Sequence, residues 1–249
     1  MMLKRRLVPS FFTFLNFFWG FFSIVKTLEG NLHAAAWFII LAILCDGMDG
    51  KLARWTSSET SFGFELDSLA DLISAGLAPA MLAYRGGFDG HGFMGMVLCF
   101  LYAFAGGYRL ARFNVVQAGD RSRGYIGLPI PIAGLTVASL WLFEPPFGFK
   151  TSVIAWIILL VALEVLMISS VRYDWPRISF KDNWRNTLQS VGILCAVGLM
   201  AFFPQWSLFP LFVLYVVLGV RVWAVALARG EASLTDFFLT VKSDRIVRG

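Results

Sequence analysis

Charged side chains are scarce in this sequence: 15% of its 249 residues are Asp, Glu, Lys or Arg, whereas 58% are hydrophobic. Soluble domains usually contain about 45–50% apolar residues, so the composition predicts an all-α, polytopic helical membrane protein. There are only two histidines and three cysteines, with no CxxC pair, which argues against a zinc site. Cys45, Cys99 and Cys195 lie in or beside apolar runs and are expected to be small core residues.

The net charge of +5 does not indicate a nucleic-acid partner, because the basic residues stand at the ends of apolar runs rather than on one soluble face. When alternate connections are assigned to opposite sides of a membrane, all but Lys26, Arg85 and Lys150 of the 21 basic residues fall on one side. The positive-inside rule then places both termini in the cytoplasm. We expect an integral protein of a bacterial inner (plasma) membrane.

Apolar runs of roughly 17–25 residues mark the candidate spans. The basic and then apolar start resembles a signal peptide, but no small-x-small cleavage site follows, so we interpret it as a retained first span. Eight spans are favoured, and three short runs and the break at Pro204 leave six or seven as alternatives. The expected helices cover residues 9–27, 32–54, 63–84, 92–116, 129–144, 151–171, 187–203 and 206–228.

Four carboxylates stand at helical spacings between two apolar segments, on the side predicted to be cytoplasmic. Asp46 and Asp49 share one face of the second expected helix, and Asp67 and Asp71 are one turn apart on the third. Antiparallel packing of the two helices would gather all four around one small volume. Oxygen ligands select hard cations such as Mg²⁺ or Mn²⁺, with Ca²⁺ possible, and four acids can hold two ions that bind a diphosphate.

Small residues and an arginine accompany these acids. Gly50 and Gly63 would let a ligand approach the backbone, and Arg54 lies about one turn beyond Gly50, where it can hold a phosphate. Simple ion pairing does not explain the cluster, because one arginine cannot neutralise four buried acids. A cation transporter would explain the acids but not the glycines, and a membrane prenyltransferase would lack the Gly-x-x-Ala-Arg insert.

The spacing resembles, without a departure, the signature of the CDP-alcohol phosphotransferases. The resemblance implies integral membrane enzymes that move a phosphatidyl group from CDP-diacylglycerol to an alcohol and release CMP. It also implies a two-metal site made by the four aspartates, Asp71 as the base, a nucleotide contact from Thr60, and a homodimer. The matching residues are Asp46-x-x-Asp49-Gly50-x-x-Ala53-Arg54, eight residues, then Gly63-x-x-x-Asp67-x-x-x-Asp71.

Further stretches resemble the branch of that family that uses L-serine as the acceptor alcohol: 65–71 with 78–80, 109–114, 127–131, and 166–173 with 180–181. Arg109 and Arg112 stand at i, i+3 on the fourth expected helix and could hold the carboxylate of serine. Positive-inside anchoring explains these arginines equally well. Glycerol phosphate, inositol phosphate and choline therefore remain alternative acceptors.

The resemblance runs from about residue 11 to residue 181. We therefore expect a six-helix core over 1–186, followed over 187–249 by two additional helices and a cytoplasmic tail. Thr13 and Asn16 are polar residues in a run of phenylalanines on the first expected helix. Either they reach the nucleotide, or they form hydrogen bonds between helices.

Overall fold

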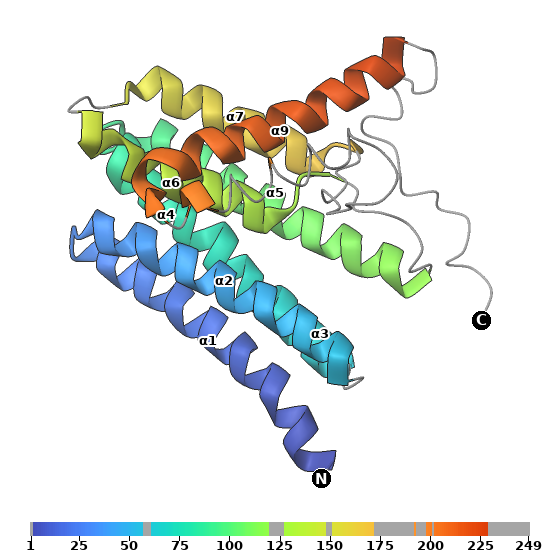
Figure 1. The fold of residues 1–249 in the computed structure, drawn as a ribbon. Coiled ribbons are helices and arrows are strands. Elements are labelled where there is room, and N and C mark those ends of the chain that lie inside the picture. Colours follow the sequence, from blue (N-terminus) through green and yellow to red (C-terminus); the bar gives the residue numbers. More distant parts are fainter. Residues whose placement is uncertain are drawn as a thin grey trace.

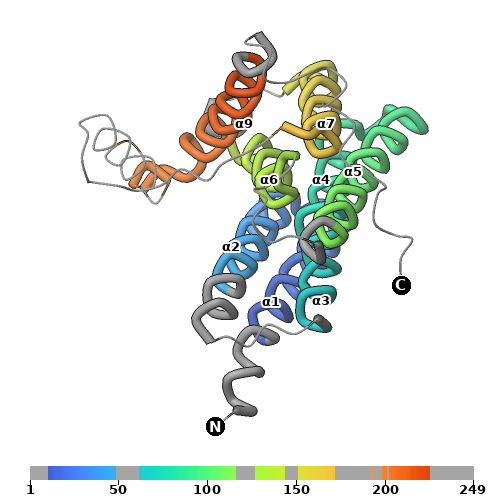
Figure 2. Tube along the Cα trace, turned by 90° about the vertical axis from the view of Figure 1, so that its right-hand side faces the viewer, coloured from blue at the N-terminus to red at the C-terminus, as the bar shows by residue number. Residues whose placement is uncertain are grey.

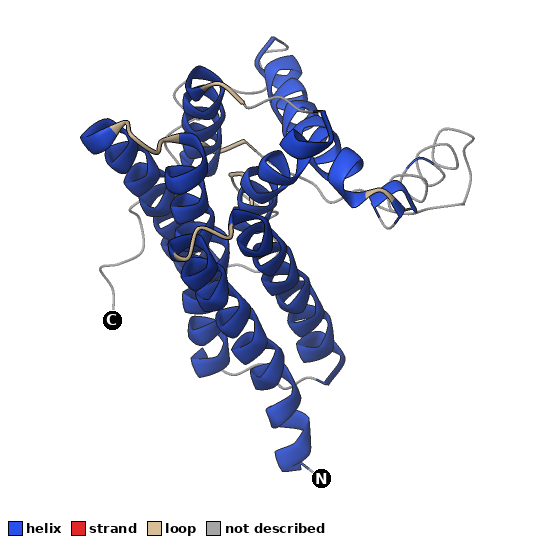
Figure 3. Cartoon of the chain, turned by 90° about the vertical axis from the view of Figure 1, so that its left-hand side faces the viewer, coloured by secondary structure: helices blue, strands red, loops and turns tan. Residues whose placement is uncertain are grey.

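The computed structural model describes residues 2–56, 61–119, 127–147, 151–171, 192, 198–200 and 202–228. All of the secondary-structure elements among these residues are helices (Figure 3). The elements, labelled in Figure 1, are α1 (Met2–Leu28), α2 (Leu32–Thr56), α3 (Ser61–Asp71), η1 (Leu72–Leu77), α4 (Ala78–Gly87), α5 (Gly92–Gly119), α6 (Ile130–Phe147), α7 (Val153–Ile168) and α9 (Pro204–Ala228).

The first two helices form an antiparallel pair that underlies the rest of the bundle. A tight turn joins them, with Gly30 at a φ of +80° and the Asn31 side chain accepting a hydrogen bond from the Ala34 amide at 3.2 Å. The continuous stretch α3–η1–α4 packs against α1, while α5 packs against η1 and α7. Helix α6 lies between α2 and α9, and α7 and α9 lie on the opposite side of the bundle from α1 (Figure 2).

The third expected helix contains an irregularity that hydrophobic spacing does not reveal. Residues Leu72–Leu77 form a π-helical segment, in which the Ala78 amide donates to the carbonyl of Ile73, five residues back. The buried Tyr102 hydroxyl of α5 donates to the Ala75 carbonyl at 3.2 Å. Insertions of this kind are frequent at functional sites, and this one begins directly after Asp71.

Small residues allow the helices to approach closely, as is common where lipid removes the hydrophobic drive between helices. A β-carbon on Gly20 of α1 would lie 2.8 Å from the Cα of Ser74 in η1, so no other residue fits there without movement. A β-carbon on Gly87 would lie 2.6 Å from the buried Trp156 ring of α7. These contacts set the spacing of α1 from η1 and of α4 from α7.

The outer surface is apolar, the reverse of a soluble bundle. Phe14 of α1 is 60% exposed and Phe100 of α5 is 63% exposed, and many other large apolar side chains also face outward. Within the described residues, four stretches are long and apolar enough to cross a membrane: Phe11–Leu28, Phe62–Gly87, Gly92–Val115 and Pro204–Ala224. Shorter apolar helices cover Leu32–Met48, Ile130–Phe143 and Val153–Ile168. The chain is therefore an integral membrane protein with several spans.

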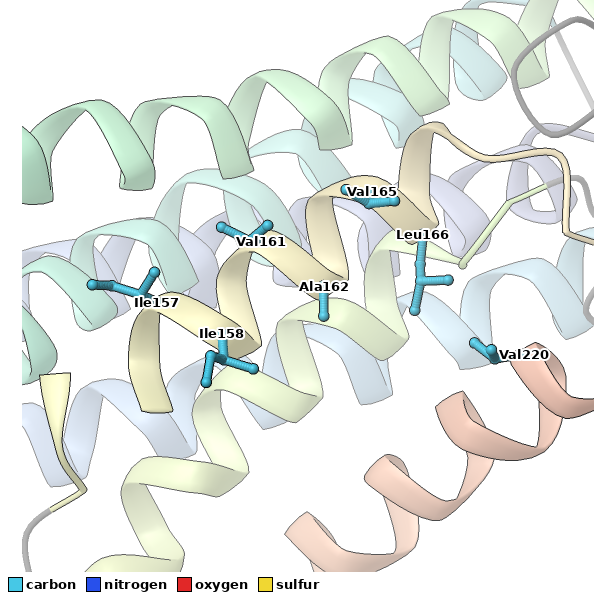
Figure 4. Close-up of a pocket in the computed structure, with 7 residues that line it drawn as sticks. All are labelled: Ile157, Ile158, Val161, Ala162, Val165, Leu166 and Val220. Carbon is cyan, nitrogen blue, oxygen red and sulfur yellow. The ribbon is translucent and has the colours of Figure 1, made fainter. Parts of the chain in front are cut away.

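The expected and observed helices agree to within a few residues at most ends. Helix α9 begins at Pro204, where a break is predicted, and it continues through Pro210. Most of the expected helix over 187–203 lies outside the described residues. An apolar groove of about 520 Å³ runs between α7 and α9 and is lined by six α7 side chains and Val220 (Figure 4). None of its lining residues is polar, so the groove suits lipid and is not a site for chemistry.

The entry to α6 is tied to the end of α7. Gly127 has a φ of +80°, its amide donates to the Val171 carbonyl, and the Leu128 amide donates to the Leu166 carbonyl. A β-carbon on Gly127 would lie 2.6 Å from both the Arg112 guanidinium and the Met167 carbonyl. This position therefore requires glycine for two reasons, backbone conformation and space.

We expect Gly127→Ala to destabilise the protein more than Gly30→Ala. Both glycines have a φ of +80°, but nothing lies within 4 Å of a β-carbon at Gly30. Left-handed strain alone costs about 1–2 kcal/mol, so the Gly30 variant should lose a few degrees in Tm, and the Gly127 variant roughly 10 °C or more. Thermal unfolding in detergent measures both. Equal losses would show that the crowding around Gly127 has no energetic effect.

Candidate active site

Asp71 is the centre of a polar cluster inside the bundle. It is the last residue of α3 and is 8% exposed. The Asn16 side-chain amide of α1 donates to Asp71 Oδ1 at 3.0 Å. The Asp46 carboxyl of α2 lies within hydrogen-bonding reach of Asp71, and Asp67 and Arg109 interact with it electrostatically. Residues from α1, α2, α3 and α5 therefore meet at one carboxylate.

Two of the predicted metal ligands, Asp46 and Asp67, interact with a third, Asp71. Asp46, Asp67 and Asp71 are described with their side chains, and Asp46 and Asp67 are partly buried. For Asp49, Gly50, Ala53 and Arg54 the backbone is described as part of α2, but the side chains lie outside the described set. Gly63 lies partly buried on α3, one turn before Asp67, and Thr60 falls outside the described residues.

The donor set suits a hard cation. Asp46, Asp67 and Asp71 offer only oxygen atoms, the ligands that Mg²⁺, Mn²⁺ and Ca²⁺ prefer. Neighbouring carboxylates repel one another unless a cation or a proton lies between them. Among the side chains that the structure describes, no three acidic, histidine or cysteine groups already converge as closely as a metal site requires. The chemistry of the donors therefore fits a divalent ion, and the fourth predicted ligand is Asp49.

Arg109 belongs to this cluster. It is 4% exposed, interacts with Asp71, and stacks its guanidinium on the Phe113 ring at 5.1 Å. Phe113 in turn stacks on Phe64 of α3, with ring centroids 6.4 Å apart. Directly after Phe113 on α5, the Asn114 amide donates to the Ser68 hydroxyl of α3 at 3.1 Å. These contacts hold α5 against α3 and orient a buried cation toward the acids.

Arg112 has a different environment, although it is only three residues from Arg109. Its guanidinium donates to three consecutive carbonyls at the end of α7: Met167 at 3.1 Å, Ile168 at 2.6 Å and Ser169 at 2.8 Å. Carbonyls at a helix end have no partner within the helix, so Arg112 acts as a cap for α7. The two arginines that the sequence pairs by spacing therefore have separate partners.

The sequence predicts the acids but not the contacts around Asp71. For Asn16, the hydrogen bond to Asp71 confirms the interhelical alternative. The π-helical turn after Asp71 and the Tyr102 hydroxyl that bonds to it had not been predicted. Only the polarity of Asn16 among phenylalanines signals its role, because nothing in a run such as 72–77 distinguishes π from α helix.

Comparison with known proteins identifies relatives of this chain. Residues 6–168 match the family model described as CDP-alcohol phosphatidyltransferase. The chain is 33% identical over 221 residues to a CDP-diacylglycerol–serine O-phosphatidyltransferase of Helicobacter pylori, covering 87% of this chain and 91% of that protein. It is 34% identical over 183 residues to the Bacillus subtilis protein of the same name, covering 74% and 96%.

A third relative is an archaetidylserine synthase of Methanothermobacter thermautotrophicus, 38% identical over 173 residues, which cover 69% of this chain and 70% of that protein. The family match spans the helices that carry Asp46, Asp71 and Arg109 and continues to the end of α7. This protein is a member of the CDP-alcohol phosphatidyltransferase family.

Proposed function

We propose that this protein transfers the phosphatidyl group from CDP-diacylglycerol to L-serine, giving phosphatidylserine and CMP. The observation that carries this proposal is the convergence of Asp46, Asp67 and Arg109 on Asp71 inside an apolar bundle. Buried charges of this kind are costly and mark functional sites in membrane proteins. The names of the Helicobacter pylori and Bacillus subtilis relatives supply the acceptor, serine.

Members of this family use divalent metal ions. We propose that Asp46, Asp49, Asp67 and Asp71 hold two of them, Mg²⁺ or Mn²⁺. When bound, such ions grip a diphosphate and stabilise charge on the leaving phosphate. Gly50, Gly63 and Ala53 leave room for the nucleotide beside the acids, and Arg54 and Thr60 contact its phosphates or ribose. These five assignments depend on the family signature.

In the proposed reaction, the serine hydroxyl oxygen attacks the β-phosphorus, which carries diacylglycerol, and the bond from that phosphorus to CMP breaks. The proton of the hydroxyl passes to Asp71, so the serine oxygen carries no charge once it bridges to phosphorus. CMP leaves with the electron pair of the broken bond. Arg109 is the described cation best placed to hold the serine carboxylate, since it is buried beside Asp71. Arg112 caps α7 and is assigned a structural role.

For the chain as a whole we propose eight spans: a six-helix core over 1–186, and two further helices with a cytoplasmic tail over 187–249. The distribution of basic residues supports a cytoplasmic active site and cytoplasmic termini in a bacterial inner membrane. The family resemblance supports a homodimer. The acyl chains of the donor would stay in lipid between helices, against exposed apolar side chains such as Phe14 and Phe100.

Asp71→Asn should lower serine-dependent CMP release by about 10²–10⁴-fold, because a neutral amide cannot take the proton of the hydroxyl. Binding of CDP-diacylglycerol should persist. The matched control is Asp89→Asn, which alters an exposed aspartate paired with Arg85 between α4 and α5. Full activity of the Asp71 variant in purified enzyme would rule out its role as base.

Chelation of divalent ions by EDTA should abolish CMP release, and adding back Mg²⁺ or Mn²⁺ should restore it, because the carboxylates favour hard cations. The same assay identifies the substrates when serine is exchanged for glycerol phosphate, inositol phosphate or choline, and when diacyl and ether-lipid CDP donors are compared. CMP release with another alcohol but not with serine would contradict the proposed acceptor.

The two arginines should respond differently to replacement by alanine. Arg109→Ala should raise the KM for serine by roughly tenfold or more, as expected for a lost charge-assisted hydrogen bond, with little change in the KM for CDP-diacylglycerol. Arg112→Ala should instead lower Tm, because three carbonyls at the end of α7 lose their donor. If the Arg112 variant keeps its Tm and loses serine affinity, the assignments are reversed.

A further inference from the structure

Asn16 has a buried side-chain amide that donates a hydrogen bond to Asp71, the proposed base. It lies on α1, is 0% exposed, and donates through Nδ2 to Asp71 Oδ1 at 3.0 Å across 55 residues of sequence. A hydrogen bond to a charged acceptor in a low-dielectric interior is stronger than one at a surface. This bond therefore fixes the orientation of the Asp71 carboxylate firmly.

The packing of α1 against η1 makes the bond geometrically well defined. Gly20 stands one turn after Asn16 on α1, and a β-carbon there would lie 2.8 Å from both Cα and Cβ of Ser74. Ser74 is three residues beyond Asp71 in the π-helical turn. The close approach at Gly20 thus sets the distance between the helices at the same level at which the amide reaches the carboxylate.

The chemical character of the donor matters as well. An amide donates a hydrogen bond without adding a second positive charge to that of Arg109, which already interacts with Asp71. A lysine or arginine at the same place would form an ion pair with the carboxylate. Asn16 therefore combines orientation with electrical neutrality, which suits the support of a base.

We propose that Asn16 is a positioning residue for the reaction: it holds one oxygen of Asp71 so that the other faces the acceptor hydroxyl. The inference rests on the proposed function, because it takes Asp71 to be the base. In this proposal Asn16 acts through Asp71 and does not itself contact either substrate. Its loss should therefore lower kcat and leave the KM of both substrates nearly unchanged.

The test compares Asn16→Leu with Ser23→Ala. Leucine has as many side-chain heavy atoms as asparagine and suits an apolar helix, so the variant should fold, with a Tm lowered by a few degrees because Asp71 loses a donor. Ser23 is the matched control, because it is also on α1, 0% exposed, and donates across to α2, at 2.9 Å to the Ala35 carbonyl. We expect kcat to fall about 10- to 100-fold for Asn16→Leu and less than about twofold for Ser23→Ala.

Asn16→Asp provides a second variant of the same shape that lacks the amide donor. It should lose at least as much kcat as Asn16→Leu and retain CDP-diacylglycerol binding, measured without serine. A kcat within about twofold of wild type for either variant, or a loss confined to the KM of one substrate, would overturn the inference.

The two proposals fail in different ways. If the wild-type protein releases no CMP with serine, the proposed function fails, and the variants are compared with whichever alcohol the wild type accepts. If the wild type uses serine and Asn16→Leu matches Ser23→Ala, only the role of Asn16 is refuted.

Discussion

Burial of carboxylates in an apolar bundle is the constraint on which the rest of the structure depends. An unpaired buried charge costs several kcal/mol, and Asp71 is buried with two further acids nearby. The fold meets this cost by directing polar groups from separate helices to one place: Asn16 from α1, Asp46 from α2 and Arg109 from α5. The site is thus also the point where four helices are held in register.

Close packing makes that convergence possible. Glycine at position 20 brings α1 against η1, and Tyr102 supports the Ala75 carbonyl in the widened turn. Farther from the acids, Arg112 closes the end of α7 and Gly127 leaves space for it. The two arginines of α5 therefore have different roles. Arg109 interacts with Asp71, whereas Arg112 caps the end of α7.

Much of this could be predicted from the sequence, for a physical reason. Charges in apolar runs are rare enough to stand out, so the sequence predicts that Asp46, Asp67 and Asp71 lie close together. The apolar runs themselves predict the positions of most helices. Inward and outward faces of membrane helices are both apolar, so spacing does not show which side of α6 or α7 is buried. The separate partners of Arg109 and Arg112 depend on that packing, and so does the bond of Asn16. The π-helical turn leaves no compositional trace at all.

That turn also has a consequence for the phase of the helix it interrupts. Each residue of an α-helix rotates the chain by about 100° around the helix axis. A π-helical insertion adds a residue and so changes the direction in which all later side chains point. Asp71 can therefore face Asp46 of α2, while Ala78, Leu82 and Ala83, fully buried, face the core farther along the same stretch. By this count Asp67, Asp71, Ala78 and Leu82 would share one face of a straight α-helix, and the inserted residue rotates the second pair away from the first. The irregular turn thus uncouples the orientation of the chemistry from the orientation of the packing.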